Sequence, residues 1–134
     1  MKNIGVCNMG VALLREILCY AKVKPAVLQV ELHPYNTQEK LLRFCKEKGI
    51  AVTGYSNLGA ISYVEMGMAT QEDSVMNEAV VGEIAAKHGK TKAQVVLRWA
   101  VQRGTAVIPK STNPERQLEN IGLFDFSLEQ SDMD

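Results

Sequence analysis

Three side chains that bind anions lie close together in residues 106–120. Lys110, Ser111 and Arg116 offer an ammonium, a hydroxyl and a guanidinium group in one short segment. Pro114 is favoured at the first position of a helix, so Asn113 is its expected N-cap and the next N–H groups are expected to point outward. Cationic side chains beside a helix N-terminus suit a phosphate monoester. The spacing alone fits a solvated helix start equally well.

Two residues further along the predicted helix extend this candidate site. Glu119 and Asn120 lie one turn beyond Arg116 and could offer an acceptor and an amide to a heterocycle attached to the phosphate. The whole segment therefore suggests a nucleotide ligand.

Strands and helices that alternate along the chain must position these residues. Short apolar or β-branched segments predict strands within 3–8, 26–32, 50–56 and 105–109. Apolar spacing and end signals predict helices over 11–22, from a cap at Asn36 to Gly49, over 78–88, from a Thr91 and Gln94 capping box to residue 103, and from Pro114 onward. The long connection over 58–76 is typical of a functional loop.

This alternation predicts an α/β fold in which parallel strands are joined by right-handed crossovers. A (β/α)₈ barrel needs about 250 residues and eight βα units, and the chain has about half of each. The sequence therefore predicts half of a TIM barrel: four parallel βα units plus an extra helix over residues 1–134, with no second domain. One face of the sheet is expected to lack a cover.

The composition argues against several kinds of partner. The 134 residues include 15 basic and 15 acidic side chains, so no net field attracts nucleic acid or an anionic membrane. No apolar run is long enough for a membrane span or a signal peptide, which predicts a cytoplasmic protein. Cys7, Cys19 and Cys45 lack the spacing of metal ligands, so no metal site is predicted and buried thiols are expected.

The segment IPKSTNPERQLEN, residues 108–120, resembles the third signature of the aldo-keto reductases and matches it completely. Residues 25–59 resemble the sixth and seventh strands of that family, and IGVCN resembles its IGVSN fifth strand. The resemblance covers almost the whole chain. It implies the C-terminal half of a TIM barrel that binds NADP(H) across its C-terminal face and reduces small aldehydes or ketones by hydride transfer.

The resemblance also implies a role for each matching residue. Lys110, Ser111 and Arg116 would bind the 2′-phosphate of NADP(H), which two cations favour over the hydroxyl of NAD(H). Tyr55 would stack on the nicotinamide ring. The remaining residues would contact the adenine (Glu119 and Asn120), the carboxamide (Asn8 and Gln29) and the pyrophosphate (Ser56, Leu58 and Gly59).

Several positions depart from the family pattern. Cys7 replaces a serine and Met9 an aromatic residue, Asn57 replaces a proline, and Ala60 replaces a common serine. Asn57 removes the fixed backbone angle of proline and Ala60 removes a hydroxyl, so we expect the loop to hold the cofactor less tightly.

The catalytic Asp, Tyr, Lys and His of the family belong to strands that this chain does not match, so no catalytic residue is predicted. His33 is expected to serve in packing or in a loop hydrogen bond. We expect the chain alone to be inactive and to need a missing N-terminal half, or to self-associate through its exposed sheet edges. The alternative is a truncated, inactive relative that binds nucleotides or other proteins.

Overall fold

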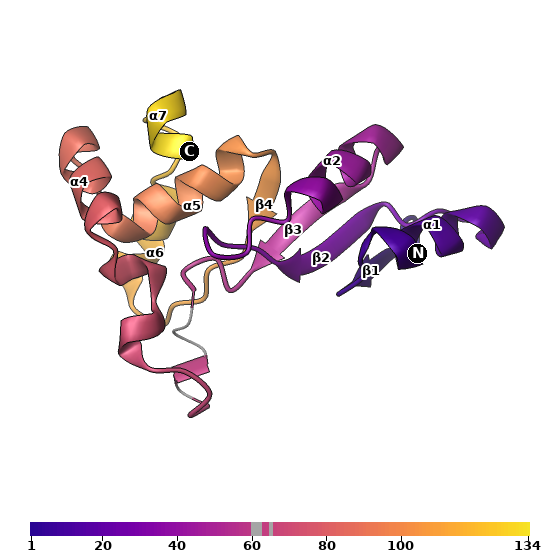
Figure 1. Cartoon of the computed structure of the whole chain (residues 1–134), viewed down its shortest axis with the longest axis horizontal. Helices are drawn as coiled ribbons and strands as arrows, with labels where there is room; N and C mark the ends of the chain where they lie inside the picture. Colours follow the sequence, from indigo (N-terminus) through magenta and orange to yellow (C-terminus); the bar gives the residue numbers. More distant parts are fainter. Residues whose placement is uncertain (60–62, 65) are drawn as a thin grey trace.

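The computed structural model describes residues 1–59, 63–64 and 66–134, and Figure 1 shows how their elements are arranged. The strands are β1 (Gly5–Cys7), β2 (Val27–Glu31), β3 (Ala51–Tyr55) and β4 (Thr105–Val107). The helices are α1 (Val11–Tyr20), α2 (Glu39–Lys48), α4 (Ala79–His88), α5 (Lys92–Gln102), α6 (Pro114–Ile121) and α7 (Gln130–Met133). Two single-turn segments, η1 (Gln71–Asp73) and η2 (Val75–Asn77), lie between β3 and α4.

The four strands form one parallel sheet in the order β1-β2-β3-β4. Within it, Gln29 lies between Cys7 and Thr53, and Thr53 pairs in turn with Ala106. Each connection between successive strands contains at least one helix, so the predicted α/β class with parallel strands is confirmed. Because the strands run in one direction, the segments that follow them emerge at the same end of the sheet.

Most helix ends follow the predicted signals. Gly49 and Gly89 end α2 and α4 with φ of 68° and 60°, the left-handed region that favours glycine. Thr91 and Gln94 form the predicted capping box at the start of α5.

The predicted cap at Asn36 is wrong. Gln38 precedes α2 in a left-handed conformation, while Asn36 forms a bridge with His33 and donates its amide to the Glu31 carbonyl at 3.3 Å. Asn36 is therefore engaged in a local turn and does not cap α2.

Two groups of buried apolar side chains form the core on the helical side of the sheet. One group comprises Leu14, Leu28, Val30, Leu41, Phe44, Cys45, Ile50 and Val52. The other comprises Leu32, Val75, Val81, Ala85, Val95, Val96, Trp99, Ala100 and Leu128. Leu42 of α2 packs against both groups.

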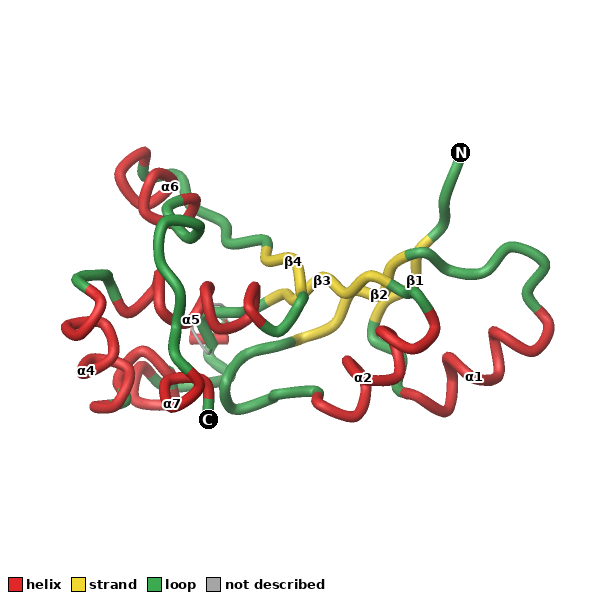
Figure 2. The backbone as a smooth tube through the Cα atoms, turned by 90° about the horizontal axis from the view of Figure 1, so that it is seen from above, coloured by secondary structure: helices red, strands yellow, loops and turns green. Residues whose placement is uncertain are grey.

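The opposite face of the sheet is open. Figure 2 shows α1 and α2 on one side of β1 and β2, with no helix of the described chain across from them. Cys7, on this face, and Cys19, away from the face of α1 that buries Leu14, are exposed. The expectation of three buried thiols is therefore wrong for both, and holds only for Cys45.

Among the described residues, none of the helices combines the length and the apolar character needed to cross a membrane.

Candidate functional site

The connection from β4 to α6 is held by its own side chains. Asn113 caps α6 as predicted, because its Oδ1 accepts hydrogen bonds from the N–H groups of Glu115 at 2.8 Å and Arg116 at 3.3 Å. Ser111 Oγ accepts from the Asn113 N–H at 3.1 Å, and Gln117 donates to the Ser111 carbonyl at 2.8 Å. These bonds fix the backbone that carries the anion-binding side chains.

These hydrogen bonds also show that the backbone N–H groups at the start of α6 are not the anion-binding groups that the sequence predicted. Asn113 already occupies the N–H groups of Glu115 and Arg116, so these groups are not free to bind a ligand. The attraction for an anion rests instead on the side chains of Lys110 and Arg116.

A cavity of about 470 Å³ brings most of the predicted cofactor residues together. One wall is the loop after β3 and the other is the connection from β4 to α6. Its predicted members are Ser56, Leu58, Gly59, Lys110, Ser111, Arg116, Glu119 and Asn120. The segments that meet here are far apart in the sequence, so the fold assembles a site at the carboxyl ends of β3 and β4.

Glu119 is fixed within this cavity by the start of α5. Thr91 donates its hydroxyl to the Glu119 carboxylate, and Gln94 donates to the Glu119 carbonyl at 3.1 Å. The residues that cap α5 therefore also position α6, which leaves the Glu119 side chain little freedom.

The loop after β3 is anchored by a buried side chain, that of Asn57. Asn57 is only 4% exposed, and its amide donates to the Leu32 carbonyl at 2.8 Å. This hydrogen bond anchors the loop through the Asn57 side chain, and the expectation that the loop holds the cofactor less tightly stays a prediction. Gly59 has φ of 78°, and a Cβ there would lie 3.3 Å from the Val75 side chain. Ala60, the other departure in this loop, lies outside the described residues.

The residues predicted to bind the nicotinamide end lie in a second region. Tyr55 donates its hydroxyl to Asn8 Oδ1 at 3.0 Å, and the Asn8 N–H donates to the Gln29 carbonyl at 2.9 Å. Asn8 and Tyr55 line a smaller hollow of about 260 Å³. Gln29 lines neither hollow; it lies on the open face between Cys7 and Thr53.

A network that the motifs did not identify lies next to Tyr55. Glu31 is the register partner of Tyr55, and its carboxylate contacts His33 Nε2 at 3.1 Å and accepts from the Tyr63 hydroxyl at 3.0 Å. Burial and the Glu31 hydrogen bond raise the pKa of Tyr63. His33 thus makes the kind of hydrogen bond expected of it. The alternation of side chains in VLQVE could have indicated Glu31, because it places Glu31 on the same face of the sheet as Gln29, which was predicted to bind the cofactor.

The hydroxyls of the described tyrosines near the site are engaged by acceptors. Tyr35 donates to Glu78, which raises its pKa, while Tyr55 donates to Asn8 and Tyr63 to Glu31. Among the described side chains, no lysine is hydrogen-bonded to these hydroxyls, and no cluster of three or more His, Cys, Asp and Glu forms a metal site.

Known proteins with the same sequence pattern and fold are reductases. The model of the Aldo/keto reductase family matches residues 1–134. A probable NAD(P)H-dependent D-xylose reductase of Emericella nidulans is 48% identical over 134 residues, which are 98% of this chain and 42% of that protein. An NAD(P)H-dependent D-xylose reductase of Aspergillus niger is 42% identical over 134 residues. The chain thus spans less than half the length of these curated relatives.

Solved structures confirm the half-barrel fold. An aldo-keto reductase from a Medee basin deep-sea metagenome library, MGS-M4, superposes with a TM-score of 0.86 at 35% identity, over 98% of this chain and 46% of that one. An aldo/keto reductase of Brucella melitensis gives 0.83 at 36% identity, over 99% and 46%. Because the family model matches residues 1–134, the chain belongs to the aldo/keto reductase family.

Proposed function

We propose that residues 1–134 form the NADP(H)-binding side of a reductase that interconverts a carbonyl compound and its alcohol. The observation that carries this proposal is the cavity of about 470 Å³, in which Lys110 and Arg116 meet Glu119, Asn120 and the loop after β3. The name NAD(P)H-dependent, given to the xylose reductases, supports a nicotinamide cofactor.

The donor set favours the phosphorylated cofactor. Lys110 and Arg116 provide two positive charges, and Ser111 provides a hydroxyl, around one wall of the cavity. A guanidinium and an ammonium bind a phosphate dianion far better than a neutral hydroxyl, so the 2′-phosphate of NADP(H) is the expected ligand group. Gly59, which would contact the pyrophosphate, lets the backbone of this loop lie close to Val75.

At the other end of the site, Tyr55 would stack on the nicotinamide, while the amides of Asn8 and Gln29 would bind its carboxamide. The Tyr55 hydroxyl already contacts Asn8, so the stacking residue and one carboxamide ligand are positioned together. Bound NADPH would supply the hydride that reduces the carbonyl carbon. The protein must hold the ring in one orientation and deliver a proton to the carbonyl oxygen.

Cofactor titration tests the proposed site. The chain is titrated with NADPH and, in parallel, with NADH, and both titrations are repeated on Arg116→Ala. We expect NADPH to bind more tightly than NADH, and Arg116→Ala to weaken NADPH binding by at least about tenfold, the loss of one charge-assisted contact. Lys22→Ala is the control, because it removes one positive charge outside the cavity. Equal binding of NADPH by Arg116→Ala and Lys22→Ala would refute the assignment.

We propose that the proton donor comes from a segment outside residues 1–134. The tyrosines near the site donate to Glu78, Asn8 and Glu31, and a raised pKa at Tyr35 and Tyr63 opposes proton donation at neutral pH. The first carbonyl substrate to test is D-xylose, which the relatives are named for.

A complementation assay separates an enzyme from an inactive relative. The N-terminal half of a similar xylose reductase is added to this chain, and D-xylose-dependent oxidation of NADPH is measured. Recovered turnover that requires both halves supports the reductase. Retained NADPH binding without turnover supports the second candidate, a nucleotide-binding or interaction protein, which the engaged tyrosine hydroxyls favour.

We further propose that the open face of the sheet is covered either by the remaining strands of a barrel or by a second copy of the chain. In the described part, β1 and β4 each have one strand neighbour, and unpaired edges beside exposed apolar residues favour association.

A further inference from the structure

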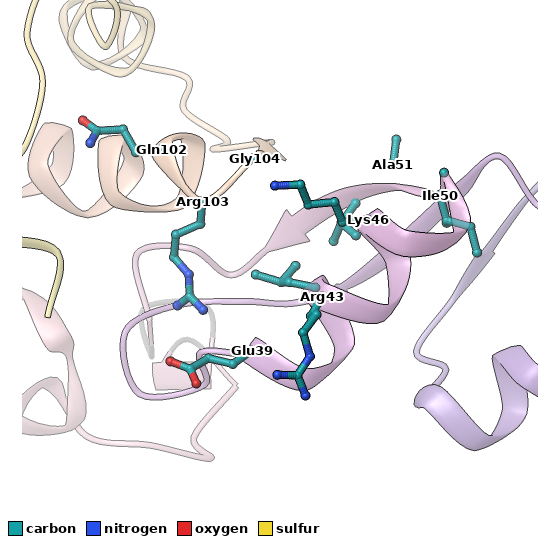
Figure 3. A pocket seen from close by; sticks show the side chains of 11 residues that line it. Glu39, Arg43, Lys46, Ile50, Ala51, Gln102, Arg103 and Gly104 are labelled. Carbon is teal, nitrogen blue, oxygen red and sulfur yellow. The ribbon is translucent and has the colours of Figure 1, made fainter. Parts of the chain in front are cut away.

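A second cleft, of about 690 Å³, opens between α2 and α5 (Figure 3). Gly49, Ile50 and Gly104, which line it, directly precede β3 and β4. The cleft therefore lies at the amino ends of these strands, whereas the proposed cofactor cavity lies at their carboxyl ends. The two sites are separated by the length of the sheet.

The charges that line this cleft are unbalanced. Arg43 and Lys46 reach it from α2 and Arg103 reaches it from the end of α5, while Glu39 is the one carboxylate in its lining. In Figure 3, Lys46 extends toward Gly104 and Arg103 extends toward Glu39. The ion pairs of the described residues all involve other side chains, so these cations form no ion pair with any described residue.

Arg103 is held in place before any ligand arrives. Its guanidinium lies over the Trp99 ring, 4.4 Å from the centroid, and burial lowers its pKa while Glu39 acts in the opposite direction. Stacking fixes a planar group that could otherwise rotate, so less conformational entropy is lost when an anion binds.

Basic side chains near a helix C-terminus also stabilise the helix dipole, and this accounts for Lys46 and Lys48 in the last turn of α2. The same explanation covers Arg103 at the C-cap of α5. It does not account for Arg43 in the middle of α2, or for the meeting of basic side chains from two helices around one hollow. Two guanidinium groups and an ammonium around one hollow match the oxygens of a phosphate group. We propose that this cleft binds a small phosphate-bearing polyanion, at a site distinct from the cofactor cavity.

Trp99 provides a local probe for the test. It is the only tryptophan in the sequence and lies beneath Arg103. The chain is titrated with inorganic pyrophosphate at constant ionic strength, and Trp99 emission is followed. We expect a saturable change, with a Kd about tenfold higher in Lys46→Ala, the loss of one charge-assisted hydrogen bond. Lys40→Ala, which removes the same charge from α2 outside the cleft lining, should leave the Kd unchanged.

Two further variants test the direction of the change in Kd and the location of the binding site. Glu39→Gln should lower the Kd for pyrophosphate, because it removes the one negative charge that faces the anion. An unchanged Kd in Glu39→Gln would show that the anion does not lie near this carboxylate, and would count against the proposed cleft. Arg116→Ala should not alter the Trp99 response, because Arg116 lines the other cavity. A response that does not saturate, or equal Kd values for Lys46→Ala and Lys40→Ala, would overturn the proposal.

Discussion

Gly54 and Asn57 fit together at the end of β3. A Cβ added at Gly54 would lie 2.5 Å from Asn57 Nδ2 and 3.2 Å from Leu32 Cβ. The Asn57 amide cannot move aside freely, because it is buried and donates to the Leu32 carbonyl at 2.8 Å. We expect Gly54→Ala to lower the free energy of unfolding by about 2 kcal/mol, as overpacked cores do. Urea denaturation measures this change.

Two comparisons show whether the Asn57 contact causes that loss. Gly10→Ala should cost only about 1 kcal/mol, for the less favourable N-cap of α1, since a Cβ at Gly10 would meet nothing within 4 Å. Gly54→Ala should also cost less in an Asn57→Ala background, because the clashing amide is gone. Strictly additive effects of the two substitutions would contradict this explanation.

Residue by residue, the sequence was informative where a site is continuous in the chain. Lys110, Ser111 and Arg116 lie in one motif, and the structure brings all three to one cavity. The anchoring role of Asn57 could not be predicted, because its partner is the backbone carbonyl of Leu32, which follows β2 and is distant in the sequence. The role of Glu31 could not be predicted either, because its partner Tyr63 lies beyond β3.

Helix α7 is tied to α4 by charged side chains. Asp132 contacts His88 Nε2 at 2.8 Å and Lys87 Nζ at 2.9 Å. These hydrogen bonds, that of His88 first, lower the pKa of Asp132 to about 2. A carboxylate with a lowered pKa stabilises the folded state above its unfolded pKa of about 3.9, and that stabilisation is lost as the pH falls through the folded value of about 2.

We therefore expect Asp132→Asn to destabilise the protein at neutral pH and to have progressively less effect between about pH 4 and pH 2. Urea midpoints of both proteins across this range measure the difference. Glu47→Gln on α2 is the control, because Glu47 is exposed and makes none of these contacts. An Asp132→Asn effect that stayed constant down to pH 2 would show that its charge is not involved.

Leu42 connects the two buried groups of the core. We expect Leu42→Ala to cost about 2 kcal/mol, the low end for a leucine truncation, because the side chain is only partly buried. We also expect the unfolding transitions seen by Trp99 emission and by circular dichroism to separate, since Trp99 belongs to one group only. Leu118→Ala, at a residue 73% exposed, is the control. Coincident transitions in Leu42→Ala would show that other contacts couple the groups.

At the level of elements, the strands and the larger helices could be predicted because their signals are local: apolar spacing, capping boxes and glycines after helices. Helix α7 was not predicted. It has four residues, too few for a periodic pattern, and its contacts with Lys87 and His88 come from a distant helix. Such short elements depend on tertiary contacts rather than on propensity.

The molecule as a whole exposes apolar surface along one edge of its sheet. Ile121 and Phe124, which are 69% and 72% exposed, line a hollow of about 460 Å³ beside Val107 of β4. The strand itself has a neighbour on one side only in the described part. A second copy could pair its β1 with this β4 in the parallel direction, and two such contacts would close a symmetric barrel of both sheets.

If a second copy of the chain covers the open face of the sheet, the apparent mass should rise with protein concentration in sedimentation or light scattering. Ile121→Glu should weaken that association by about tenfold or more, because it places a charge in the interface. Val80→Glu is the matched control, since Val80 is 55% exposed on α4, away from the sheet edges. If the chain were a monomer at every concentration, a second copy would not cover the open face, and the remaining strands of a barrel would be the alternative. Equal weakening by both variants would show that association is a general consequence of exposed apolar surface, and that β4 does not direct it.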